Sequence, residues 1–238
     1  MTKKYNVAIV GATGAVGEAM ISILEQRKFP VGNVYALASE RSAGKRIPFN
    51  GGMLSVEDLA EFDFSKADIG LFSAGAGVSE KYAPIAAASG CVVIDNTSQF
   101  RYDDDIPLVI PEVNPESIAQ HTKRGIIANP NCSTIQMLVA LKPIYDAVGI
   151  ERINVCTYQA VSGSGKEAIE EVVSQTAQLL NGKPIQTKVY PKQIAFNVLP
   201  QIDVFMENGY MREESDPQAL VKNPEPLAKY VGVKAHVQ

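Results

Sequence analysis

The chain has 238 residues, of which 46% are hydrophobic and 20% charged, a composition that is ordinary for a globular protein and excludes general disorder. The 22 basic and 26 acidic residues give a net charge of −4 and form no basic cluster, so we expect no nucleic-acid partner. Apolar runs are too short for a membrane span, and the N-terminal residues lack the pattern of a signal peptide. The three cysteines have neither CxxC nor metal-ligand spacing, which predicts a cytoplasmic protein without a metal site.

In the first part of the chain, short apolar runs alternate with helical patterns, which is typical of an α/β protein with a Rossmann-type parallel sheet. Ligands of such sheets bind in the loops at the carboxyl ends of the strands. The expected strands are residues 7–10, 34–38, 69–72, 92–94, 108–110 and 126–128, and the expected helix is 15–24.

The pattern changes near residue 130, where we place a domain boundary. Residues 1–130 form the expected nucleotide-binding domain, and residues 131–238 form a second, α+β domain. In this second part we expect a helix that carries Ile135, Leu138 and Val139 on one face, a strand at residues 153–158 and a helix at residues 167–180.

A glycine-rich loop, Gly11-Ala12-Thr13-Gly14-Ala15-Val16-Gly17, joins the first strand to the first helix. Backbone N–H groups and the helix dipole at such a place can bind a pyrophosphate, which predicts a dinucleotide site. The alternative is a tight turn with close helix packing. The candidate cofactor ligands are Gly11, Thr13, Gly14, Ala15, Val16 and Gly17.

After the second strand, Ser39, Arg41 and Ser42 favour NADP over NAD, because a guanidinium forms bidentate hydrogen bonds with a 2′-phosphate. Glu40 opposes this interpretation, since a carboxylate turned inward would repel the phosphate. The alternative is an ordinary solvated loop.

Cys132 follows Asn129-Pro130-Asn131 and precedes a predicted helix, so its sulfur should lie at a helix N-terminus, where the thiolate is favoured. From the residues alone, a nucleophile and a packing residue are both open for Cys132. Cys91 and Cys156 lie in apolar, strand-like runs and are expected to be small core residues.

The run Ser162-Gly163-Ser164-Gly165-Lys166 suggests a phosphate-binding P-loop, but Ala160 and Glu167 occupy positions where that motif needs glycine and a hydroxyl residue. We therefore expect a turn that enters the next helix and is placed to contact a cofactor.

Taken together, several motifs resemble those of bacterial aspartate-semialdehyde dehydrogenases. The resemblance runs from about Val7 to Glu214 and lies in the glycine loop, Ala38-Ser39-Glu40-Arg41-Ser42-Ala43-Gly44, Ser73-Ala74-Gly75, Asp95-Asn96-Thr97-Ser98-Gln99-Phe100-Arg101, Asn129-Pro130-Asn131-Cys132-Ser133-Thr134 and Tyr158-Gln159-Ala160-Val161-Ser162-Gly163-Ser164-Gly165.

The resemblance implies a Rossmann domain followed by an α+β catalytic and dimerisation domain, in a homodimer or homotetramer. It implies an oxidoreductase of lysine (diaminopimelate), methionine and threonine biosynthesis. In this family a cysteine attacks aspartyl 4-phosphate, expels phosphate and holds a thioester that NADPH reduces to aspartate 4-semialdehyde.

The same resemblance assigns roles to individual residues. It makes Cys132 the nucleophile, Gln159 the residue that orients the acyl group, Arg101 and Asn131 the phosphate ligands, and Glu213 the ligand of the substrate's amino group. It adds Ser73, Gly75, Asn96, Ser162 and Gly163 to the cofactor ligands. The open alternatives are a surface salt bridge between Arg101 and the aspartates that follow it, a backbone contact for Gln159 and solvation of Glu213.

The resemblance ends after Glu214. The family has a phosphate-binding lysine where this chain has Asp216, and then a substrate arginine and a histidine base that neither His121 nor His236 matches. We therefore expect an incomplete second domain and poor turnover. The alternatives are a non-catalytic NADP-binding relative and a reductase of another acyl phosphate, N-acetylglutamyl or glyceroyl phosphate.

Overall fold

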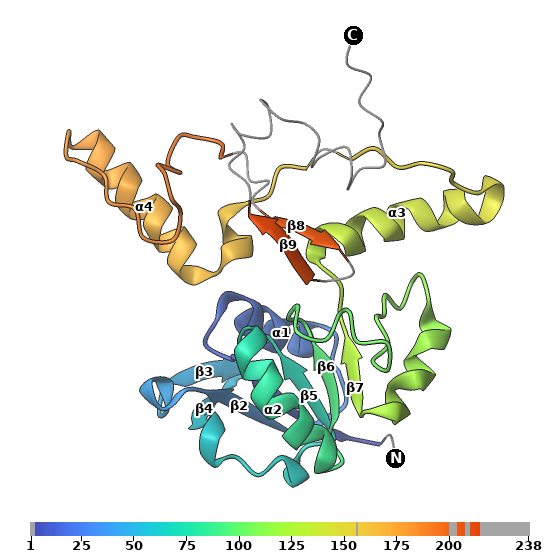
Figure 1. The fold of residues 1–238 in the computed structure, drawn as a ribbon. Coiled ribbons are helices and arrows are strands. Elements are labelled where there is room, and N and C mark those ends of the chain that lie inside the picture. Colours follow the sequence, from blue (N-terminus) through green and yellow to red (C-terminus); the bar gives the residue numbers. More distant parts are fainter. Residues whose placement is uncertain (1–2, 156, 200–203, 208–209, 215–238) are drawn as a thin grey trace. The chain divides into compact units, whose positions relative to one another are not determined.

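The computed structural model describes residues 3–155, 157–199, 204–207 and 210–214 (Figure 1). The chain divides into two compact units, and the break falls between Lys166 and Glu167. The predicted boundary near residue 130 separates functional domains and stays a prediction. Within the described ranges, no helix is both long and apolar enough to cross a membrane.

One seven-stranded sheet forms the centre of the first unit, in the order β3-β4-β2-β1-β5-β6-β7 (Figure 1). All neighbouring strands are parallel except β3 and β4. The chain passes from β1 to β2 on one side and later to β5 on the other, so β1 is the topological switch point where such folds bind ligands. The predicted Rossmann-type α/β fold is confirmed. The strands are β1 (Tyr5–Val10), β2 (Val31–Ala38), β3 (Arg46–Phe49), β4 (Gly52–Asp58), β5 (Ile69–Phe72), β6 (Val92–Asp95) and β7 (Ile126–Ala128).

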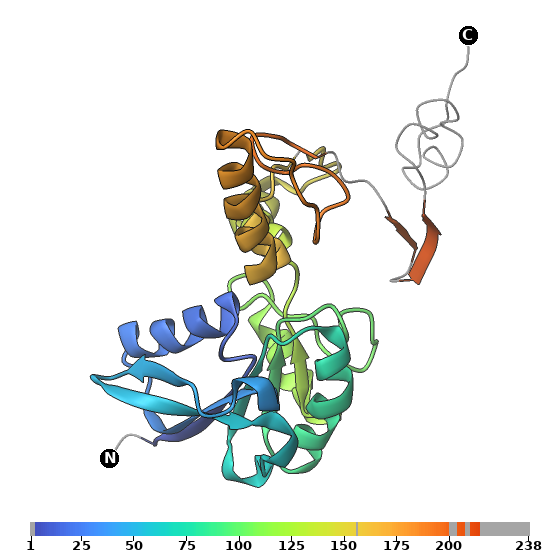
Figure 2. The same cartoon turned by 90° about the vertical axis from the view of Figure 1, so that its left-hand side faces the viewer.

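Helices cover both faces of this sheet (Figure 2). Side chains alternate along a strand, and in β1 Ile9 packs in a buried cluster with Ile21 of α1, whereas Val10 packs in a second cluster with Ala83 of α2. Because β1 is buried on both faces, its sequence is a continuous apolar run rather than an alternating one. The two helices are α1 (Ala15–Gln26) and α2 (Ala76–Ala88).

Two expectations about strands differ from the structure of the first unit. Residues 108–110 form no strand: Leu108 makes an isolated parallel bridge to Ala128, and the N–H of Ile110 donates instead to the side chain of Asn114 at 2.8 Å. The hairpin of β3 and β4 was not predicted. Short 3-10 helices complete this unit: η1 (Glu40–Ser42), η2 (Leu59–Glu61), η3 (Phe64–Lys66), η4 (Pro115–Lys123) and η5 (Val161–Ser164).

Two helices confirm the predictions for the later part of the chain, but the strand expected at residues 153–158 is wrong. No described residue of this segment pairs with a strand, and Val155 and Tyr158 are 53% and 89% exposed. A strand forms only where a neighbour satisfies its N–H and C=O groups. Cys156 lies outside the described residues. The elements are α3 (Cys132–Val148), α4 (Lys166–Leu180), β8 (Val204–Glu207) and β9 (Tyr210–Glu214).

A buried glutamine holds the loop that follows α4 in the second unit. Gln175 is fully buried, and its Nε2 donates to the carbonyl of Gln186 at 3.2 Å. Its Oε1 accepts from the N–H groups of Ile194 and Ala195. A buried amide with these partners is satisfied at both ends, so it fixes this loop against the helix.

Candidate functional site

Most candidate residues lie along one edge of the sheet, at the carboxyl ends of β2, β1, β5, β6 and β7, which are neighbours in that order. The loop after β2 carries Arg41, the loop after β1 carries the glycines, and the loop after β5 carries Ser73. The loop after β6 carries Arg101, and β7 leads into Cys132. Segments far apart in sequence therefore form one continuous row.

In the glycine loop, the main chain at the start of α1 lies very close to the main chain at the end of β1. Gly11 has φ +89, and its N–H donates to the carbonyl of Leu37 at 2.9 Å. A Cβ on Gly17 would lie 2.2 Å from the carbonyl oxygen of Gly11, so any side chain there would push α1 away from β1. Within the described residues, no side chain caps α1 at Gly14, which leaves the first N–H groups of the helix available for an anion.

The loop after β2 brings a second cation to the residues predicted to hold the 2′-phosphate. Arg41 and Ser39 are exposed, whereas Ser42 is buried. The Nζ of Lys45 donates to Ser42 Oγ at 3.3 Å. We did not predict a role for Lys45, which lies three residues after Ser42, because only the turn that follows η1 brings its side chain back to Ser42.

The ends of β5 and β6 place three more candidates beside the glycine loop. The N–H of Ser73 donates to the carbonyl of Val10 at 2.9 Å. Gly75 precedes α2 with φ +100, a conformation that favours glycine. The N–H of Asn96 donates to the carbonyl of Phe72, and its Oδ1 accepts from Asn129 Nδ2.

Cys132 is exposed and lies at the N-terminus of a helix, as predicted, where it is the first residue of α3 rather than the residue before it. Asn131 caps the helix: its Oδ1 accepts from the N–H of Ser133 at 2.9 Å and from Cys132 Sγ at 3.8 Å. Among the described residues, no partner occupies Asn131 Nδ2, so this amide can donate to an oxyanion. The positive end of the helix dipole also faces the sulfur.

Arg101 is half-buried and fixed by two main-chain carbonyls. Its Nε donates to the carbonyl of Asn129 at 2.9 Å, and its Nη2 to that of Asn96 at 3.1 Å. Burial lowers the pKa of Arg101 from its ordinary value, while Asp95, Tyr102 and Cys132 raise it. Within the described part of the chain, Nη1 makes no hydrogen bond. Guanidinium N–H groups therefore stay free for an anion near Cys132.

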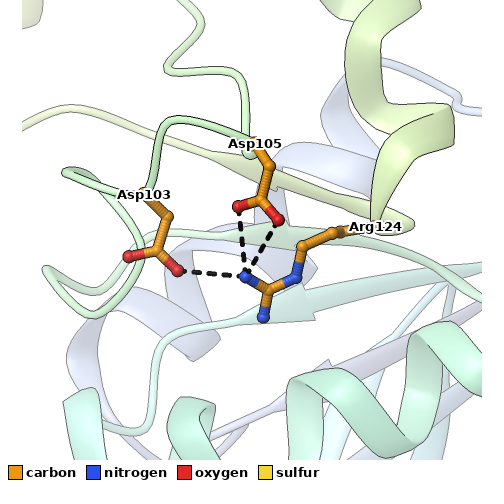
Figure 3. Close-up of polar contacts among 3 residues, drawn as sticks. All are labelled: Asp103, Asp105 and Arg124. Carbon is orange, nitrogen blue, oxygen red and sulfur yellow. Dashed lines mark hydrogen bonds and ion pairs between the residues drawn. The ribbon is translucent and has the colours of Figure 1, made fainter.

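The alternative of a surface salt bridge for Arg101 is not supported. The aspartates that follow it pair with Arg124, whose Nη1 lies 3.2 Å from Asp103 Oδ2 and 3.2 Å from Asp105 Oδ1 (Figure 3). Neither of these carboxylates bonds to Arg101. These ion pairs join the loop that carries Arg101 to the residue after η4.

The remaining candidates lie later in the chain than the residues of this row. Gln159 is exposed and lies against Gly163, and no hydrogen bond joins Gln159 to Cys132 within the described ranges. Ser162 belongs to η5. For Glu213 the structure describes the backbone of β9 alone, where it pairs with Phe205.

In the part of the chain that the structure describes, no titratable cluster outside the row suggests other chemistry. Among the described residues, no group of three His, Cys, Asp or Glu side chains could hold a metal ion. His121 lies in η4, where its Nδ1 is 2.8 Å from the carbonyl oxygen of Ile118. Asp216 and His236 lie outside the described residues.

Comparisons with known proteins show the family to which the chain is similar. Residues 6–121 match the family model described as semialdehyde dehydrogenase, NAD binding domain, and residues 141–224 match semialdehyde dehydrogenase, dimerisation domain. The sequence is 68% identical over 214 residues to the aspartate-semialdehyde dehydrogenase of Shewanella violacea, a match that covers 90% of this chain and 63% of that protein. This chain thus spans less than two thirds of that relative's length.

Solved structures show the same similarity. Aspartate semialdehyde dehydrogenase II from Vibrio cholerae, in a crystal structure complexed with ASA, matches with a TM-score of 0.84 and 59% identity, covering 97% of this chain and 67% of that one. The Candida albicans enzyme with NADP matches with a TM-score of 0.53 and 29% identity, covering 62% of this chain and 48% of that one.

Proposed function

The chain belongs to the semialdehyde dehydrogenase family, and on this premise we propose that it has the chemistry of an NADP-dependent aspartate-semialdehyde dehydrogenase. The reaction is the reductive dephosphorylation of aspartyl 4-phosphate to aspartate 4-semialdehyde, on the route to lysine, methionine and threonine. One observation carries the proposal: a single sheet edge presents the Arg41 loop, the glycine loop and the helix-terminal Cys132, in that order, which suits a dinucleotide followed by an acyl phosphate. The close relatives named above support the same substrate.

The first chemical step belongs to Cys132. Its thiolate attacks the acyl carbon, a C–S bond forms, and the C–O bond to phosphate breaks with its electron pair leaving on the phosphate. The free N–H groups of Arg101 and the Nδ2 of Asn131 would bind the departing phosphate, because charged and neutral donors there stabilise the developing negative charge. The product is a thioester on Cys132.

The residues of the sheet edge fit a dinucleotide. The close contact between Gly17 and the carbonyl of Gly11 brings the uncapped N-terminus of α1 next to the loop, where a pyrophosphate would bind. When bound, the cofactor supplies the hydride that reduces the thioester. Ser73, Gly75 and Asn96 would line the path toward Cys132.

Further roles rest on the family alone. Gln159 would orient the acyl group, Glu213 would bind the amino group of the substrate, and Ser162 with Gly163 would contact the cofactor. We place the functional boundary near residue 130, between the two matched ranges. The later domain matches a dimerisation model, and we propose a homodimer or homotetramer.

The preference for NADP is testable at Arg41. We expect Arg41→Ala to weaken NADPH binding by about 10-fold or more, because a charged hydrogen bond to the 2′-phosphate contributes about 1.5–3 kcal/mol. NADH binding should not change. Fluorescence titration of both cofactors measures this. Arg27→Ala, at the far end of α1, is the matched control. Equal losses for NADPH and NADH would contradict a 2′-phosphate contact.

The proposed chemistry is tested by its first step, which needs no cofactor. Mixing the chain with aspartyl 4-phosphate should release a burst of about one inorganic phosphate per chain, because each Cys132 can be acylated once. Cys132→Ser should remove the burst, and Cys91→Ala should keep it. A burst that survives in Cys132→Ser would contradict the assignment of the nucleophile.

A further inference from the structure

A buried carboxylate, that of Asp95, lies near Arg101, and the proposed reaction does not use it. Asp95 ends β6 and is fully buried. Its Oδ1 accepts from Ser79 Oγ at 2.8 Å and from the N–H of Thr97 at 3.1 Å, and its Oδ2 accepts from Thr97 Oγ1 at 2.8 Å. A buried charge is costly unless it is hydrogen-bonded, so a carboxylate at this place needs these donors.

These bonds order the start of the loop that carries Arg101. Thr97 is held to Asp95 by both its N–H and its hydroxyl, and the same hydroxyl accepts from the N–H of Gln99 at 3.2 Å. The carbonyl of Asp95 also accepts from the N–H of Asn129 at 2.8 Å. The two carbonyls that hold Arg101 belong to Asn96 and Asn129, so both are tied to Asp95.

We propose that Asp95 is a positioning residue that holds Arg101 in the orientation that binds the phosphate group of the substrate. The inference rests on the proposed function, because it assumes that Arg101 binds phosphate. Asp95 itself touches neither substrate nor cofactor. Its carboxylate fixes the Thr97 turn and thereby the main chain at Asn96, whose carbonyl is one of the two that hold the guanidinium.

Removing the charge of Asp95 and losing the orientation of Arg101 would change the affinity for phosphate in opposite directions, so the role of Asp95 can be measured. The carboxylate of Asp95 is close enough to influence Arg101 electrostatically. Removing its negative charge while leaving Arg101 in place would strengthen the binding of an anion. Loss of the correct orientation would weaken it. Weaker phosphate binding after neutralisation of Asp95 therefore reports on position.

The test measures how inorganic phosphate protects Cys132 of the full chain from iodoacetamide. Asp95→Asn keeps the shape of the side chain but removes its charge and replaces one acceptor with a donor. We expect the phosphate concentration for half-protection to rise about 10-fold or more. Thr97→Val, which removes the hydroxyl bonds and leaves the Asp95 side chain in place, should shift it in the same direction.

Two controls separate the possible results. Arg124→Gln removes the ion pairs to Asp103 and Asp105 and should leave protection unchanged, and labelling of buried Cys91 reports any unfolded variant. Unchanged or stronger protection in folded Asp95→Asn overturns the inference alone. If Asp95→Asn unfolds, unchanged protection in Thr97→Val overturns it. Absence of protection in the unaltered chain, or protection that survives Arg101→Ala, overturns the phosphate site and the inference together.

Discussion

In the native chain, iodoacetamide should modify Cys132 at least about 1,000-fold faster than Cys91. Cys132 is exposed at the N-terminus of α3, near Arg101, whereas Cys91 is 1% exposed. Burial raises the pKa of the Cys91 thiol from 9.0 to about 12, with Asp68 adding to the shift. Three pKa units lower the thiolate fraction about 1,000-fold at neutral pH, and the thiolate is the reacting form. Peptide mass mapping over time gives both rates.

Two controls belong to this experiment. In denaturant, where burial is lost, the two thiols should react at similar rates. A Cys156→Ser background removes the cysteine whose surroundings are not described. If Cys91 of the native chain were labelled at a rate near that of Cys132, the core around β6 would be open to the reagent. That result would contradict the burial of Cys91 and the fold on which the site rests.

Removing Arg101 should have the second large effect. Arg101→Ala should slow the phosphate burst from aspartyl 4-phosphate by about 10²–10³-fold, the cost of losing one pre-positioned donor for a developing negative charge. The variant also loses the two hydrogen bonds to Asn96 and Asn129. Rapid-quench measurement of phosphate release in a single turnover gives the rate.

Arg124→Ala is the matched control for this change, since it removes the arginine that pairs with Asp103 and Asp105 of the loop that carries Arg101 (Figure 3). Its ion pairs are partly exposed, and such pairs contribute about 0–1 kcal/mol, so its burst rate should stay near that of the unaltered chain. Equal rates in both variants would show that Arg101 only supports the loop.

The parts of the fold that the sequence predicts are those with local causes. The buried strand before Gly11 and the helix after it follow from a continuous apolar run and a helical period. The position of Cys132 follows from the capping residue Asn131 before a helical pattern. The missed hairpin of β3 and β4 also had a local signal: Asn50 and Gly51 join the strands with φ +49 and +74, the Asn-Gly turn typical of hairpins.

The errors concern interactions between distant residues. Residues 153–158 have the composition of a strand, but composition supplies no neighbour, and the described residues supply none. The aspartates closest to Arg101 in sequence pair with Arg124 instead, about 20 residues farther along. The burial of Asp95 depends on Ser79, which arrives from α2. Such pairings depend on the three-dimensional arrangement of the elements, so no short segment of the sequence predicts them.

The central claim is that Cys132 carries the acyl group and that the bound dinucleotide reduces it. The most direct measurement is intact-protein and peptide mass spectrometry after mixing the chain with aspartyl 4-phosphate, before and after adding NADPH. We predict one aspartyl adduct, mapped to Cys132, that is released as aspartate 4-semialdehyde when NADPH is added. An adduct on another residue, or an adduct on Cys132 that NADPH leaves untouched, would contradict the account.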